Sequence, residues 1–121
     1  MKELHIAGTK KAPTIQYSRG HFSITGCSIP EDSRKLYKPV LTFFEEFHNY
    51  PSDHFLVEIK FDYCDTASLK WILSILIEIQ KHVSINNAEI RWYYEDDDME
   101  MLELGEFVNL RVKIPFNLIV V

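Results

Sequence analysis

A short polar run, Asp65-Thr66-Ala67-Ser68, lies where the sequence changes from a strand-like to a helix-like pattern. The start of a helix offers free N–H groups and the positive end of the helix dipole, and both favour negative charge. A phosphate on the Thr66 hydroxyl would add about −1.5 to −2 charges at this position. The run is therefore a candidate phosphorylation switch. The alternative is that Asp65 or Thr66 merely caps the helix, as such residues routinely do.

Three charged residues would set the electrostatics of a phosphate at Thr66. Lys70 follows Thr66 by four residues, which places it one helical turn further on, where it would partly neutralise the phosphate. Asp62 and Asp65 precede Thr66 in the sequence, and their negative charges would repel the phosphate. These opposing influences suit a modification that is added and removed reversibly.

A second candidate site is an acidic segment that follows an aromatic stretch. Its carboxylates are Glu95, Asp96, Asp97, Asp98, Glu100, Glu103 and Glu106. Three interpretations stay open: the acids begin a helix, they form a surface that recognises a basic partner, or they bind a metal ion. The segment lacks the alternating ligands and central glycine of a calcium-binding loop. A small metal-dependent enzyme that uses the Asp96–Glu100 cluster is the alternative function on this evidence.

Other chemistry finds little support in the sequence. The five histidines are scattered, and no metal, nucleotide or hydrolase motif is present, so we expect no metal site, no cofactor and no enzyme activity. The net charge of −5 without a basic patch argues against nucleic acid as a partner. The two cysteines form no CxxC pair, and no apolar stretch has the character of a signal peptide or could span a bilayer. We therefore predict a cytoplasmic protein that is not inserted in the membrane.

The elements that must position these residues alternate between strands and helices. Short strands are expected at residues 4–6, 14–18 and 21–25, with a tight turn at Arg19-Gly20 and Gly26 ending the pairing. The clearest strand is 54–63, whose alternation places Tyr63 on the apolar face, and a further strand is expected at 88–94. Pro115 interrupts an apolar tail at 112–121, which is expected to form an edge strand.

Three helices are expected between these strands. The first should begin at Ser28, where a hydroxyl cap precedes a proline, and stop at residues 49–51, with Phe47 on its apolar face. At Pro39 we expect either a kink or two abutting helices. The second, 66–83, is apolar over most of its circumference and should lie centrally against the sheet. The third should begin in the acidic segment and end near Gly105 or a little beyond it. This order predicts a single α/β domain over 1–121, with a mixed sheet packed by about three helices.

The chain resembles the SiaC-type regulatory phosphoproteins of bacteria over nearly its whole length. The resemblance rests on four blocks in this order: Leu4-His5-Ile6-Ala7-Gly8-Thr9 with Pro13, Ile24-Thr25-Gly26-Cys27-Ser28-Ile29-Pro30-Glu31, Phe61-Asp62-Tyr63-Cys64-Asp65-Thr66-Ala67-Ser68 with Lys70, and Trp92-Tyr93-Tyr94-Glu95-Asp96-Asp97-Asp98-Met99 with Gly105-Glu106.

The resemblance implies a fold similar to the STAS-type anti-sigma-factor antagonists and a partner-switching circuit. In such a circuit a cognate kinase phosphorylates a threonine at the strand-to-helix junction, and a PP2C-like phosphatase removes the phosphate. The unphosphorylated protein binds and activates a diguanylate cyclase, which raises cyclic di-GMP and promotes aggregation or biofilm growth. The residue that matches the phosphorylated threonine is Thr66. A non-switching structural subunit, in which Thr66 only caps a helix, is the remaining alternative.

The junction differs from the family's usual Asn-Thr-Ser-Ser. Here it reads Asp65-Thr66-Ala67-Ser68, so Ser68 is the only other hydroxyl and the second candidate for phosphorylation. Asp65 in place of asparagine adds a negative charge beside the expected phosphate. We expect this change either to weaken the phosphorylated form or to alter which kinase acts on Thr66.

Overall fold

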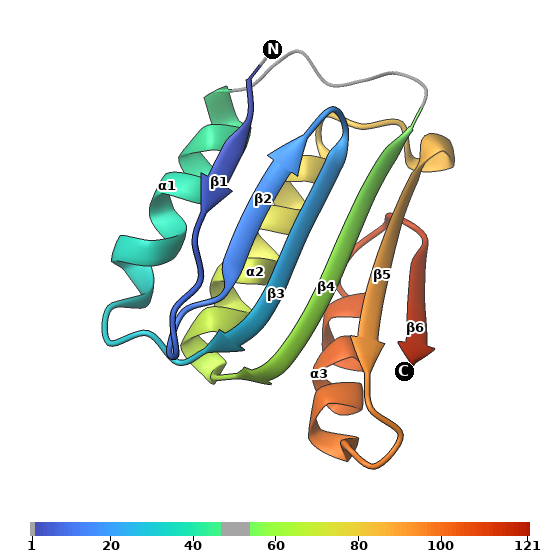
Figure 1. Ribbon diagram of the computed structural model, residues 1–121. Helices are drawn as coiled ribbons and strands as arrows, with labels where there is room; N and C mark the ends of the chain where they lie inside the picture. The colour runs from blue at the N-terminus through green and yellow to red at the C-terminus, as the bar shows by residue number, and fades with distance from the viewer. Residues whose placement is uncertain (1, 47–53) are drawn as a thin grey trace.

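One mixed β-sheet forms the centre of the computed structural model, which describes residues 2–46 and 54–121 (Figure 1). The six strands lie side by side in sequence order. They are β1 (Leu4–Ile6), β2 (Thr14–Ser18), β3 (His21–Ser28), β4 (Phe55–Cys64), β5 (Ala88–Tyr94) and β6 (Phe116–Val120). The helices are α1 (Ser33–Glu46), α2 (Thr66–Gln80) and α3 (Met99–Asn109), with a 3₁₀ turn, η1, at Ile85–Asn87. The α/β fold and mixed sheet expected from the sequence are confirmed.

The strands divide into an antiparallel and a parallel half. β1, β2 and β3 pair in antiparallel fashion, whereas β3, β4, β5 and β6 are all parallel. The β2–β3 turn has positive φ at both central residues, 50° at Arg19 and 84° at Gly20. This conformation matches the right-handed twist of the flanking strands, so the predicted tight turn at these two residues is confirmed.

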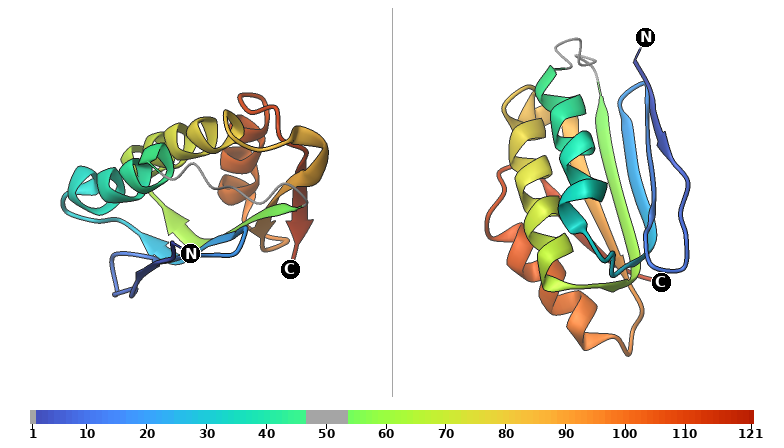
Figure 2. Two further views of the ribbon diagram at one scale, coloured as in Figure 1. Left: turned by 90° about the horizontal axis from the view of Figure 1, so that it is seen from above. Right: turned by 90° about the vertical axis from the view of Figure 1, so that its left-hand side faces the viewer.

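All three helices cover the same face of the sheet (Figure 2). Each helix connects one parallel strand to the next, and the strands follow one another in the same direction across the sheet. Right-handed crossovers that all step in one direction place their helices on one side. The carboxyl ends of β3 to β6 consequently share one edge of the sheet, the lower edge in Figure 1. The starts of α2 and α3 lie at that edge.

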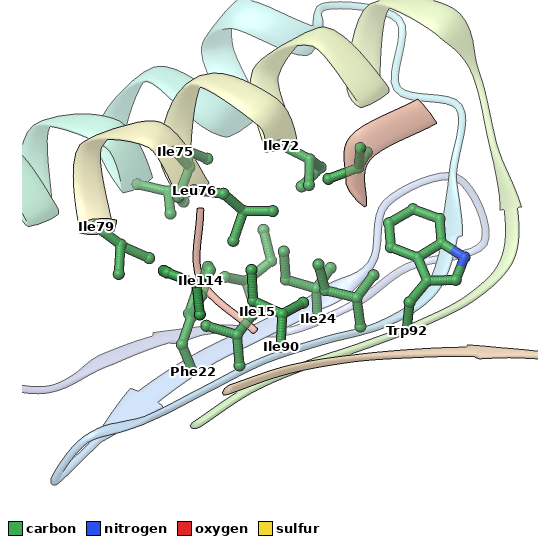
Figure 3. Close-up of a cluster of buried hydrophobic side chains, with 14 of the residues drawn as sticks. Ile15, Phe22, Ile24, Ile72, Ile75, Leu76, Ile79, Ile90, Trp92 and Ile114 are labelled. Carbon is green, nitrogen blue, oxygen red and sulfur yellow. The ribbon is translucent and has the colours of Figure 1, made fainter. Parts of the chain in front are cut away.

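The core lies between the sheet and α2, the middle helix of the layer (Figure 3). Ile72, Ile75, Leu76 and Ile79 of α2 are fully buried against the sheet. Trp92 of β5 is also fully buried, and its indole N–H donates a hydrogen bond to the carbonyl of Met101 at 3.0 Å. The central position predicted for this helix is therefore confirmed.

The sheet face opposite the helices carries a polar network centred on Glu58. The carboxylate of Glu58 accepts a hydrogen bond from the Tyr93 hydroxyl at 2.5 Å and contacts the His21 ring at 2.7 Å. The bond from Tyr93, followed by the bond and charge of His21, holds the pKa of Glu58 below its usual value. This polar character is consistent with a sheet that is packed on one side.

The predicted start of the first helix at Ser28 is wrong. Ser28 is the last residue of β3, is fully buried and pairs with Cys64 of β4. The helix begins at Ser33, and a carboxylate oxygen of Asp32 accepts a hydrogen bond from the amide of Lys35 at 3.1 Å. Pairing with a distant strand therefore outweighs the local resemblance to a helix cap.

The other helix predictions need smaller corrections. α1 continues through Pro39 as one helix, because Pro39 is exposed and the carbonyl that loses its partner is on the solvent side. The expected stop at 49–51 and the apolar contact of Phe47 lie outside the described residues. α2 ends at Gln80, three residues earlier than predicted. α3 ends at Asn109, a little beyond Gly105 as predicted.

The apolar tail forms its strand only after Pro115, as β6 at the edge of the sheet. Within the described residues, none of the helices combines the length and the apolar character needed to cross a bilayer.

Candidate functional site

A groove of about 560 Å³ lies at the carboxyl end of β4, beside the starts of α2 and α3. It brings the phosphorylation candidate Thr66 together with part of the acidic segment, although the two are about thirty residues apart in the sequence. The residues that line it are Asp62, Tyr63, Cys64, Asp65, Thr66, Leu69, Asp98, Glu100, Met101, Glu103, Leu104 and Phe107.

A β-bulge at the end of β4 turns two residues toward this groove. Gly26 pairs with Phe61, but the next residue, Cys27, pairs with Tyr63, so Asp62 is left without a partner in β3. The irregularity breaks the alternation of the strand, and Asp62 and Tyr63 are both exposed, Tyr63 by 51%. The prediction that Tyr63 belongs to the apolar core face is therefore wrong.

The first turn of α2 is capped by Asp65. The backbone of Asp65 is extended, and its carboxylate accepts a hydrogen bond from the amide of Ser68 at 2.8 Å. Thr66 is the first helical residue and is exposed. Of the two cap candidates, Asp65 is thus confirmed and Thr66 is wrong, which leaves the Thr66 hydroxyl without a capping role.

Hydrogen bonds among buried hydroxyl groups hold the first turn of α2 in place. The Ser28 hydroxyl contacts the Tyr37 hydroxyl at 2.5 Å and donates to the Ser68 hydroxyl at 2.7 Å. These three residues belong to β3, α1 and α2, and all are fully buried. Burial raises the pKa of Tyr37 above its usual value, so the hydroxyl stays protonated and available as a donor.

The burial of Ser68 argues against its expected role as a second phosphorylation site. A kinase needs an exposed hydroxyl, whereas the Ser68 side chain is enclosed and bonded to Ser28. Ser68 instead joins the start of α2 to β3. Ser68 can make this connection because it lies in the first turn of α2, three residues after the capping Asp65, and is buried.

We expect Ser68→Ala to lower the free energy of unfolding by roughly 1–2 kcal/mol, because it removes one partner from a buried hydrogen-bond chain. Ser74→Ala is the matched control: Ser74 lies in the same helix, is exposed, and donates to the Lys70 carbonyl at 3.1 Å. Its replacement should change stability by less than about 0.5 kcal/mol. Urea unfolding followed by circular dichroism measures both, and equal losses would contradict the assigned role of Ser68.

The charged side chains that line the groove with Thr66 are all negative. Five carboxylates line the groove, and no lysine or arginine does. They are Asp62, Asp65, Asp98, Glu100 and Glu103. Lys70 is exposed on α2 but does not line the groove, and within residues 2–46 and 54–121 no salt bridge joins it to an acid. A dianionic phosphate at Thr66 would therefore face repulsion from several sides.

The acidic segment serves two purposes in the structure. Asp98 caps α3, accepting a hydrogen bond from the amide of Met101 at 3.1 Å, so the helix-start interpretation is confirmed. Asp98 and Glu100 also line the groove, whereas Glu95, Asp96 and Asp97 are exposed outside it. Nowhere in the described part of the chain are three carboxylate, histidine or cysteine side chains grouped so that they could hold a metal ion.

Apolar side chains complete the groove and were not predicted as site residues. Tyr63 and Phe107 are 51% and 40% exposed, and Leu69, Met101 and Leu104 lie with them. Exposed aromatic surface beside charge is typical of a protein-binding surface. The available signal was the apolar side chains interspersed among the acids of residues 99–107, to which the sequence analysis gave no role.

Cys64 lines the same groove but is a poor nucleophile. Burial, followed by the negative charge of Asp65, raises the pKa of its thiol to about 12. At neutral pH the thiol is therefore protonated and unreactive. Both Cys27 and Cys64 are free thiols.

The sequence and the fold both match known proteins. The profile of the SiaC family regulatory phosphoproteins matches residues 6–121. An uncharacterised protein of Pseudomonas aeruginosa strain UCBPP-PA14 is 29% identical over 119 residues, which cover 96% of this chain and 94% of that protein.

Solved structures of SiaC from Pseudomonas aeruginosa share the fold. The apo-SiaC crystal structure has a TM-score of 0.85 at 27% identity, with 99% of this chain and 100% of that chain covered. A chain in the crystal structure of the diguanylate cyclase SiaD in complex with its activator SiaC has a TM-score of 0.82 at 27% identity, with 98% and 99% covered. Because the family profile covers nearly the whole sequence, the protein belongs to the SiaC family of regulatory phosphoproteins.

Proposed function

We propose that this protein is a phosphorylation-switched activator of a diguanylate cyclase. With Thr66 unphosphorylated, it binds the cyclase through the groove between α2 and α3. A cognate kinase phosphorylates Thr66 and releases the cyclase, and a PP2C-like phosphatase reverses the modification. Through the cyclase the protein controls cyclic di-GMP and, with it, aggregation or biofilm growth in the cytoplasm of its host.

The observation that carries this proposal is that Thr66 is exposed and has no capping role. It is exposed and lines a groove, while Asp65 performs the capping that would otherwise account for a threonine here. Ser68, the other candidate hydroxyl, is fully buried. An accessible hydroxyl without a structural role, in a family of regulatory phosphoproteins, supports Thr66 as the modified residue.

The groove also favours a particular kind of binding surface. Its five carboxylates suit a partner with lysine or arginine, and its exposed Tyr63 and Phe107 suit apolar anchors. A phosphate on Thr66 would occupy the groove and would have to be desolvated when the partner covers it. This desolvation cost would weaken the complex, which is the direction that a release switch requires.

The choice of partner rests on the family. SiaC is named as the activator of the diguanylate cyclase SiaD in the structure of their complex. We extend that relation to this chain because the fold is shared over almost its whole length. The protein would act by binding rather than by catalysis, and the buried, protonated Cys64 thiol offers no ready nucleophile in the groove.

A phosphotransfer assay tests the proposal. The purified protein and ATP are added to an extract of the host, and the phosphate is mapped by peptide mass spectrometry, with Thr66→Ala in parallel. We expect phosphate on Thr66 in the parent and none on the Thr66→Ala variant. An extract whose kinase activity toward this circuit has been demonstrated, yet which leaves Thr66 unmodified, would contradict the switch.

A further inference from the structure

The outer edge of β6 has no neighbouring strand among the described residues (Figure 1). On its inner side, the Pro115 carbonyl accepts from the amide of Ile90 at 2.8 Å, and the amide of Val121 donates to the Tyr94 carbonyl at 2.9 Å. Pro115 and Val121 therefore both face β5. Backbone groups alternate in direction along a strand, so every second residue between these two faces outward.

The outward-facing residues are Phe116, Leu118 and Val120, the alternates between Pro115 and Val121. Each directs one N–H and one C=O group away from the sheet, which gives the edge three free donors and three free acceptors. An unpaired edge of this kind is a template for pairing with another strand.

This edge lacks the features that usually prevent pairing. Phe116–Val120 contains no charged residue and no proline, and its sequence is FNLIV. Val120 and Val121 are 51% and 55% exposed. The opposite edge is formed by β1, which has only three residues and is too short to pair extensively.

We propose that β6 pairs with β6 of a second copy of this chain, in antiparallel orientation, with Leu118 opposite the same residue of the partner. Phe116 then lies opposite Val120 of the other copy. In an antiparallel pair, residues that face each other exchange both of their hydrogen bonds at every second position. This register therefore uses all three outward residues of each copy, and the strand is complementary to itself.

The charges at the two ends of β6 favour the same orientation. Arg111 and Lys113 precede the strand and are both exposed. At the other end, Tyr94 pairs with Val120, so the exposed Glu95 and the acids after it lie beside the end of the strand. Antiparallel pairing brings the basic end of each copy near the acidic end of the other, twice in the dimer.

The dimer should be weak and reversible. A strand of five residues is about 17 Å long, so strand pairing by itself buries less area than a permanent dimer requires. We expect a dissociation constant on the order of 100 μM. This inference is independent of the phosphorylation switch, because β6 does not line the groove.

Cysteine cross-linking tests the register. Asn117 of one copy should lie opposite Ile119 of the other, about 4.5 Å apart between Cα atoms, whereas two copies of Asn117 should be about 8 Å apart. A disulfide requires a Cα separation below about 7 Å. A mixture of Asn117→Cys and Ile119→Cys should therefore cross-link at least about tenfold faster than either variant alone.

Mass spectrometry of the cross-linked peptides excludes bonds made by Cys27 or Cys64, which both variants retain. Equal cross-linking in the mixture and in the single variants would overturn the proposed register. Absence of cross-linking in the mixture would do the same.

Sedimentation equilibrium tests the dimer itself. The parent should show a rise in weight-average mass with concentration, and Val120→Lys should reduce the association at least about tenfold, because it places a charged side chain opposite Phe116 of the other copy. Ile29→Lys is the matched control, because Ile29 is also an exposed β-branched residue, 37% exposed, and lies outside β6. A parent that stays monomeric at about 1 mM, or equal effects of the two lysines, would overturn the proposal.

Discussion

Phosphorylation of Thr66 should weaken binding of the host's diguanylate cyclase by about 100-fold, and Thr66→Glu should weaken it by about tenfold. The phosphate carries more charge than the glutamate carboxylate, and either group would have to lose its hydration when the partner covers the groove. Desolvating an ion that gains no counter-charge costs several kcal/mol, and each 1.4 kcal/mol corresponds to a factor of ten in affinity. Thr66→Ala should bind within about twofold of the parent, because it removes no cap. Isothermal titration calorimetry measures all three.

The control for added charge is Thr25→Glu. Thr25 is an exposed threonine of β3 that pairs with Lys60 of β4 and does not line the groove. The Thr25→Glu variant carries the same substitution and the same net charge as Thr66→Glu. It should nevertheless bind the cyclase as tightly as the parent does. Equal weakening by both glutamates would assign the effect to overall charge, and unchanged binding of the phosphorylated protein would refute the switch.

Gly105→Ala should lower the free energy of unfolding by about 2 kcal/mol. In an ordinary helix this change stabilises by about 1 kcal/mol, so the expected sign is opposite to the intrinsic propensity. A Cβ atom on Gly105 would lie 2.6 Å from the side chains of both Leu118 and Trp92. Trp92 is fully buried, and its indole is bonded to the Met101 carbonyl, so it has little freedom to move away.

Urea unfolding measures this loss, with Glu106→Ala as the control. Glu106 is the next residue of α3 and is exposed, and its replacement should change stability by less than about 0.5 kcal/mol. A Gly105→Ala variant as stable as the parent would show that α3 can shift away from the sheet. The groove would then be less rigid than the packing of α3 on Trp92 indicates.

Much of the fold follows from local patterns in the sequence. Alternation of apolar and polar residues predicted β4 nearly to the residue, the turn residues before Ala88 predicted the start of β5, and the Arg19-Gly20 pair predicted the hairpin. The nearly continuous apolar character of α2 predicted its central place. Each of these signals is contained within a few residues, which is why it can be read without knowledge of the rest of the chain.

The errors came from interactions between distant segments. Ser28 has the local character of a helix cap, but its pairing with Cys64 and its bond to Ser68, 40 residues away, keep it in β3. Tyr63 fits the alternation of β4, but the bulge at Asp62 turns it outward. No short-range pattern specifies where a register shift occurs between two strands.

The candidate site was predicted only in part, because it too depends on contacts between distant segments. The sequence indicated Thr66 and the acids separately, and the family resemblance marked Thr66, but neither placed Thr66 beside Asp98 and Glu100. That proximity depends on the parallel arrangement of β4 and β5, which brings the segments after both strands to one edge of the sheet. The apolar half of the groove, with Phe107, was missed because an apolar residue in a helix is ordinarily a core residue.

In the proposed switch, Asp65 caps the helix while Thr66 carries the modification, so that signalling and folding depend on different residues. Because Asp65 supplies the cap, a chemical change on the neighbouring hydroxyl leaves the start of α2 intact. The phosphorylated and unphosphorylated forms would then have the same fold and the same lifetime in the cell, and would differ only in the partner that they bind. The host could therefore hold a large stock of the inactive form without losing it to proteolysis. The time needed to restore the signal would be set by the phosphatase alone, without any refolding step.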